Sequence, residues 1–143
     1  MNIEGLFYEG LPISKIHVYL DVELTNVFMY LVETRGYIEK REFDELLKAF
    51  DGFEFDGLTI LNGNITLIFR RVFEPKKGDI EYVLKELDLL FPRVVVTLKS
   101  LEIATNRLSD DVIKKVLRIL EDNGIKAGCK HGTNETIFFA KRG

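Results

Sequence analysis

The chain has 143 residues, a net charge of −3 at pH 7, 46% apolar residues and 30% charged residues. This length suits a single core, and the composition is typical of a globular protein, which excludes a disordered or fibrous chain. The single cysteine, Cys129, excludes an intrachain disulfide, and the acidic balance argues against a bulk binder of polyanions.

The first predicted element is a strand that begins at Ile16. Apolar and polar residues alternate here, which is typical of a half-buried strand, with apolar side chains at Ile16, Val18, Leu20, Val22 and Leu24. Residues 27–32 are apolar on both faces, so we expect a second strand covered on both sides. A turn near Thr25-Asn26 would join the two strands in a hairpin.

A helix is predicted next, because Phe43, Leu46, Leu47 and Phe50 recur at helical spacing among charged residues. Asp51-Gly52 ends it. Asn62-Gly63 then lies between two apolar runs, residues 58–61 and 65–69. This pair accepts the positive φ angles of a type I′ turn and predicts a second hairpin.

The second half of the sequence predicts two further helices and a closing hairpin. One helix runs over about residues 79–91 with Asp79 as its N-cap, and strands follow over 93–98 and towards Ile103. The other helix begins after Ser109 and ends at Asn123-Gly124. The last strands are expected over about 125–131 and 136–140.

The predicted elements have the same order in two parts of the chain, residues 16–73 and 93–142. Each part reads strand, strand, helix, strand, strand, and the helix of residues 79–91 connects them. We therefore expect an α+β fold over residues 1–143, built from antiparallel hairpins and three amphipathic helices. Its two halves could be pseudo-twofold-related ββαββ repeats, and the seam between them would be a natural pocket.

Residues Leu120 to Arg142 resemble the closing helix and hairpin of the wybutosine-synthesis methyltransferase family. The Ser/Cys-rich signature of that family should fall near Thr59 to Thr66. Those positions contain neither Ser nor Cys, so no residue role and no activity is transferred from the family.

The first predicted strand carries a polar stripe that includes His17, Asp21 and Glu23. A histidine with two carboxylates could perform acid–base chemistry or hold a cation. The alternative is the wetted face of an ordinary alternating strand, which we favour. These three residues are the candidate catalytic residues.

Cys129 and His131 lie two residues apart on one predicted strand and could bind a metal ion with a distant third ligand. The alternation in this strand points both side chains to the buried face. We therefore favour packing in the core, and expect no metal and no cofactor.

Arg70, Arg71, Lys141 and Arg142 lie near the ends of two predicted hairpins. They could merge into one basic edge that binds a phosphate-bearing partner. Alternatively, they protect strand edges against aggregation.

These patterns favour a small non-catalytic binding or regulatory module that acts through a sheet edge on a protein or nucleic-acid partner. A small enzyme or ligand-binding protein with a pocket at the seam is the alternative. Strands that are apolar on both faces, with three helices to cover them, predict a homodimer. We expect a cytoplasmic protein, because no apolar run resembles a signal peptide or a membrane span. The Lys/Glu-rich helices are typical of thermophilic proteins and suggest a thermophilic source.

Overall fold

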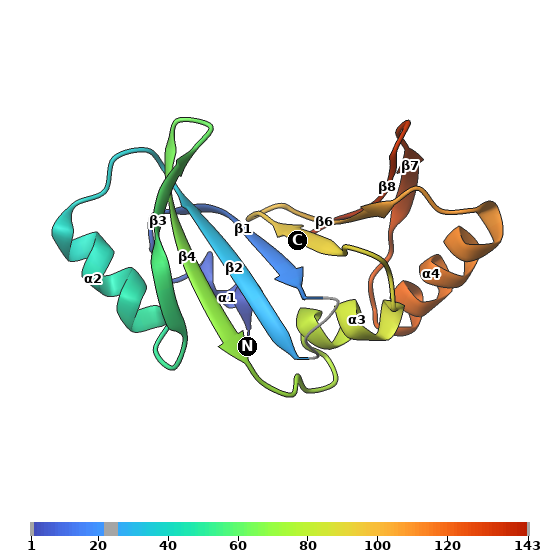
Figure 1. Cartoon of the computed structure of the whole chain (residues 1–143), viewed down its shortest axis with the longest axis horizontal. Helices are drawn as coiled ribbons and strands as arrows, with labels where there is room; N and C mark the ends of the chain where they lie inside the picture. The colour runs from blue at the N-terminus through green and yellow to red at the C-terminus, as the bar shows by residue number, and fades with distance from the viewer. Residues whose placement is uncertain (1, 22–25, 143) are drawn as a thin grey trace.

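The computed structural model describes residues 2–21 and 26–142. Within these residues the elements are, in chain order, α1 (Ile3–Leu6), β1 (Ile13–Leu20), β2 (Val27–Thr34), α2 (Lys40–Ala49), β3 (Glu54–Leu61), β4 (Asn64–Val72), α3 (Ile80–Leu87), β5 (Arg93–Val96), β6 (Ser100–Asn106), α4 (Asp110–Asp122), β7 (Gly128–His131) and β8 (Glu135–Lys141). Figure 1 shows their arrangement. The expected α+β fold is confirmed.

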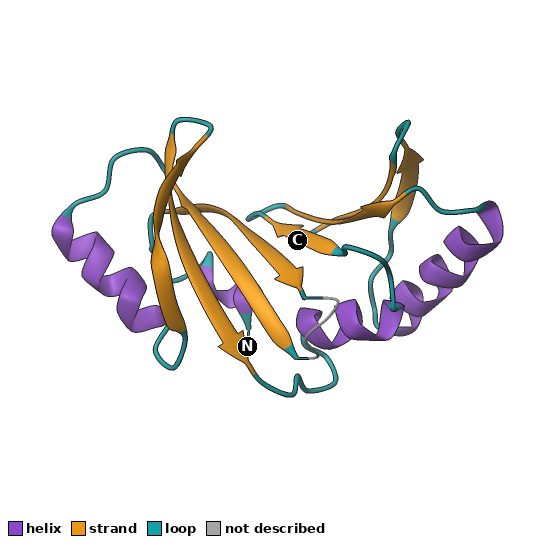
Figure 2. Ribbon diagram, viewed as in Figure 1, coloured by secondary structure: helices purple, strands orange, loops and turns teal. Residues whose placement is uncertain are grey.

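The described strands form one antiparallel sheet in the order β3-β4-β2-β1-β5-β6-β8-β7. The sheet is strongly curved, and the helices lie along one side of it (Figure 2). None of the helices of residues 2–21 and 26–142 is long and apolar enough to cross a membrane.

The core is a layer of side chains between the sheet and the helices. One row of paired residues crosses six strands and is almost completely buried: Phe69, Tyr30, Val18, Val94, Ile103 and Phe138. Helix α2 packs on this row through Phe50, whose ring stacks on Phe69 with centroids 4.4 Å apart. The row joins both halves of the chain in one continuous core.

Two local predictions are confirmed at the level of the backbone. Asn62 and Gly63 have φ angles of 53° and 79°, as a type I′ turn requires, and Leu61 pairs with Asn64 across the turn. Ser109 caps α4, because its side chain accepts a hydrogen bond from the backbone N–H of Val112.

Two element predictions are corrected, and one short helix was missed. Helix α3 ends at Leu87, not at residue 91, because Asp88 takes a left-handed conformation with φ of 50°. The short helix α1 was not predicted, since one turn is too short to show helical periodicity. Both faces of β2 were expected to be covered, but Met29 is 41% exposed on the face away from the helices.

Each half of the sheet has the same local order. In the first half β1 pairs with β2, β2 with β4, and β4 with β3. In the second half β5 pairs with β6, β6 with β8, and β8 with β7. The halves meet where β1 pairs with β5. This order is compatible with the ββαββ repeats, which remain a prediction.

Candidate functional site

His17 lies on β1, on the side of the sheet opposite the core, and its nearest charged partner is Glu33 of β2. His17 Nε2 lies 3.4 Å from Glu33 Oε2, and Asn64 Nδ2 donates to Glu33 Oε1 at 3.0 Å. The Glu33 side chain is only 4% exposed. Thr66, which pairs with Glu33 in the sheet, has a buried hydroxyl with no hydrogen-bond partner among the described residues.

Burial controls the charge of this histidine. Desolvation lowers the pKa of His17 below 6.5, and the hydrogen bond to Glu33 opposes the shift. The imidazole is therefore mostly neutral at pH 7. A neutral histidine beside a carboxylate can accept a proton, but a reaction also needs a bound substrate. His17 does not line the pocket of about 710 Å³ beside α1 or the pocket of about 420 Å³ beside Tyr19.

Of the other two members of the predicted catalytic stripe, the structure describes Asp21 alone, and it does not join His17. Asp21 lies beyond the end of β1 and is exposed. Glu23 lies outside the described residues. Sequence reasoning missed Glu33 because only the register of β1 against β2 brings it close to His17.

Arg70 and Arg71, adjacent in β4, point to opposite faces of the sheet. Arg70 forms a 2.8 Å ion pair with Glu54 on β3. Arg71 lies over the rings of Phe53 and Phe73, at 5.0 and 4.8 Å from their centroids. These neighbours give both cations structural contacts within the first half of the molecule.

Lys141 and Arg142 lie at the end of β8, in the other half of the sheet. Lys141 is exposed. The Arg142 side chain is 8% exposed, donates to the backbone oxygens of Thr97 and Glu4, and pairs with the Glu4 carboxylate at 3.4 Å. The four cations of the predicted basic edge are therefore divided between strands separated by β2, β1, β5 and β6. Partner binding by them remains a prediction.

Cys129 and His131 both lie on β7, but Cys129 is partly buried and His131 is exposed. Cys129 packs against the core, and burial raises the pKa of its thiol. The expected burial of His131 is wrong, because this residue is exposed at the strand end, where its Nδ1 lies 3.2 Å from Thr136 Oγ1. In the part of the chain that the structure describes, no three His, Cys, Asp or Glu residues are grouped to hold a metal ion.

The sheet face opposite the helices is a second candidate site. No helix within the described ranges covers it, and we call it the helix-free face. The strand register aligns its side chains in two rows. One row contains Arg70, Met29, Tyr19, Arg93, Ala104, Ile137 and Lys130; the other contains Ile68, Leu31, His17, Val95, Glu102 and Phe139.

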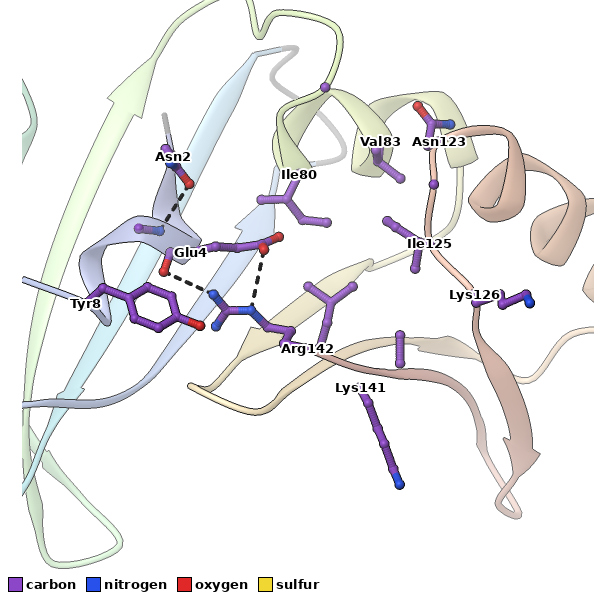
Figure 3. A pocket seen from close by; sticks show the side chains of 15 residues that line it. Asn2, Glu4, Tyr8, Ile80, Val83, Asn123, Ile125, Lys126, Lys141 and Arg142 are labelled. Carbon is purple, nitrogen blue, oxygen red and sulfur yellow. Dashed lines mark hydrogen bonds and ion pairs between the residues drawn. The ribbon is translucent and has the colours of Figure 1, made fainter.

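A pocket of about 710 Å³ lies on the helix side, where α1 meets the connecting helix α3, the segment that follows α4, and β8. Its apolar lining includes Ile80, Val83 and Ile125, while Lys126 and Lys141 lie at its margin (Figure 3). We call it the seam pocket. A smaller pocket of about 420 Å³ lies beside Tyr19 and Arg93.

Comparisons with known proteins give no relative: no family model, no curated protein and no solved structure matches this chain.

Proposed function

We propose that the protein is a non-catalytic binding module and that the helix-free face is its recognition surface. The two aligned rows of side chains on this face support the proposal. Met29 and Phe139 are 41% and 42% exposed there, and large uncovered apolar side chains on a contiguous surface commonly mark interaction sites. The proposal replaces the expected sheet-edge surface, because Arg70 and Arg142 are already paired with Glu54 and Glu4.

The chemistry of the face favours a protein partner over a nucleic acid. Its rows combine Met, Tyr, Phe and Arg, which are enriched in protein interfaces. The cations of the face are offset by acidic residues, because Arg70 is paired with Glu54 and Glu102 lies in the second row. A polyanion would require a net positive surface, and the whole chain carries a net charge of −3.

Charge-introducing variants test this proposal. Met29→Glu and Phe139→Glu place carboxylates on the helix-free face, and Val112→Glu makes the same change on α4, where the side chain is 38% exposed. A partner captured from cells of the source organism is purified, and its dissociation constant is measured with each variant. We expect binding at least about tenfold weaker for the face variants and unchanged for Val112→Glu.

Two results would contradict the proposal. One is a partner that binds the face variants as tightly as the wild type. The other is tight binding of single-stranded RNA at about 50 mM salt that Met29→Glu abolishes, which would assign the face to nucleic acid.

The seam pocket supports a second candidate function, the binding of a small ligand. Its volume of about 710 Å³ falls in the range of ligand sites, and its lining combines apolar side chains with polar ones, of which Lys126 and Lys141 suit the anionic group of an amphipathic ligand. Octanoate and ATP can serve as probes in thermal unfolding. Ile125→Trp should reduce any stabilisation they cause by filling the pocket, whereas stabilisation unchanged by this variant would exclude the seam pocket.

A further inference from the structure

The edge strand β3 is open over its second half. Helix α2 packs on its first half, where the Phe43 and Phe55 rings lie 6.0 Å apart. Further along the strand, Leu58 is 52% exposed and Ile60 is 72% exposed. No charged residue lies between Gly57 and Gly63. Uncharged apolar edges of this kind are templates for strand pairing, and natural proteins usually protect them.

The backbone of β3 is also available for pairing. A two-residue turn makes Leu61 and Asn64 a hydrogen-bonded pair, so the next pair, Ile60 with Ile65, is not hydrogen-bonded across β3 and β4. The Ile65 carbonyl instead accepts a hydrogen bond from Thr34 Oγ1 of β2 at 2.9 Å. The N–H and C=O groups of Ile60, and by alternation those of Leu58, therefore point out from the edge of the sheet.

We propose that β3 pairs with β3 of a second copy of this chain in an antiparallel, twofold-symmetric dimer centred on Thr59. In this register Leu58 lies opposite Ile60 of the partner subunit, and Ile60 opposite Leu58 of the partner subunit. The outward N–H and C=O groups of both residues are satisfied, and four apolar side chains meet on the helix side. Thr59 faces Thr59 of the partner subunit across the axis.

The sequence of β3 selects this register over its neighbours. Centring the pairing on Leu58 would place Ile60 opposite the bulge at Asp56 of the partner subunit, and centring it on Ile60 would place Leu58 opposite Asn62 of the partner subunit, in the turn. Each alternative leaves an apolar side chain opposite a residue outside the regular part of the strand. In the proposed register the paired segment runs from Gly57 to Leu61, between the bulge and the turn, and it contains no charged residue, so no like charges are opposed.

The dimer also fixes the relation between the two helix-free faces. A twofold axis through an antiparallel strand pair is perpendicular to the sheet, so both helix-free faces point the same way and all helices lie on the other side. The two sheets become one continuous sheet. This inference does not depend on the proposed function, because β3 could pair whether or not the face binds a partner.

Cysteine cross-linking tests the register in a Cys129→Ala background. Thr59→Cys places two thiols across the axis in a non-hydrogen-bonded pair, with Cβ atoms about 4.5–5.5 Å apart, close to disulfide distance. Leu61→Cys is the matched control, because it faces Gly57 of the partner subunit. We expect a covalent dimer with Thr59→Cys and none with Leu61→Cys. Equal cross-linking of both variants would overturn the register.

Light scattering tests the dimer itself. The wild type should have a mass near twice 16.5 kDa at micromolar concentration, and Ile60→Lys should lower it to that of one chain. Val72→Lys makes the same change at a side chain that is 68% exposed at the end of β4, away from the pairing segment, and should remain dimeric. A wild-type mass of one chain, or a dimer that survives Ile60→Lys, would overturn the proposal.

Discussion

Tyr30 and Glu81 place a carboxyl group inside the core. The Tyr30 hydroxyl donates to Glu81 Oε2 at 2.8 Å, and both residues are fully buried. Burial raises the pKa of Glu81 above its ordinary value of 4.5 and also raises the pKa of Tyr30. The carboxyl group therefore binds a proton more readily in the folded chain than in the unfolded chain.

A pH-dependent loss of stability follows from this raised pKa. The contribution of Glu81 is fully present below pH 4.5 and is lost as the pH rises through the folded-state pKa. Glu81→Gln keeps a hydrogen-bonding group beside Tyr30 without titrating, so its free energy of unfolding relative to wild type should increase with pH.

Tyr30→Phe removes the hydroxyl that donates to Glu81 and should lower the free energy of unfolding by about 1–3 kcal/mol. Urea unfolding at pH 5 and pH 8 measures both effects; an unchanged difference for Glu81→Gln would contradict the first.

The pair formed by His17 and Glu33 shows why a site can be missed at the scale of single residues. The alternation in β1 correctly predicted the burial of Ile16 and Val18, which are inaccessible. Leu20 is partly exposed, and Val22 and Leu24 lie outside the described residues. A tight turn at Thr25-Asn26 would give β1 and β2 a different register from the observed pairing of Leu20 with Phe28. Because a shift of register changes the neighbours of every side chain, the carboxylate beside His17 could not be identified from the sequence.

At the scale of elements, strong local signals predicted the structure well and weak ones did not. Asn62-Gly63 and Ser109 act through their own backbone geometry, so the sequence was sufficient for the hairpin and for the start of α4. The end of α3 depends on Asp88 adopting a left-handed conformation, which has no clear sequence signal. Helix α1 is held by a distant partner, Arg142, and such a contact is invisible in a local pattern.

Arg142 should be important for stability although it was predicted to bind a partner. Its guanidinium connects the chain end to α1 and to Thr97, and lies 5.3 Å from the ring centroid of Phe7. Arg142→Ala removes the hydrogen bonds to the Thr97 and Glu4 backbone oxygens and the contact with Phe7, and should lower the free energy of unfolding by about 1–3 kcal/mol. The adjacent variant Lys141→Ala alters an exposed side chain and should change it by less than about 0.5 kcal/mol. If chemical denaturation gave a loss of unfolding free energy for Arg142→Ala as small as that for Lys141→Ala, Arg142 would have no structural role.

At the scale of the whole molecule, the pairing of β1 with β5 makes one sheet from two halves. The sequence predicted the hairpins within each half, because their strands are close neighbours in the chain. It gave no sign that β1 would pair with β5, since residues 16–19 and 93–96 are far apart in sequence and both are simply apolar strands. The helix-free face and the seam pocket depend on this long-range pairing, so neither could be fully assembled from local patterns.

The same pairing predicts that the two halves unfold together. Val18 and Val94 face each other across the joint and are fully buried, so Val18→Ala or Val94→Ala should each cost about 2 kcal/mol. Because the core is continuous, the loss should appear as one earlier transition in urea, with hydrogen exchange increasing equally in residues 27–72 and 100–141. Val112→Ala, on the exposed side of α4, is the control and should leave the transition unchanged. Exchange that increases in only one half would show that the halves are separate folding units joined by a weak contact.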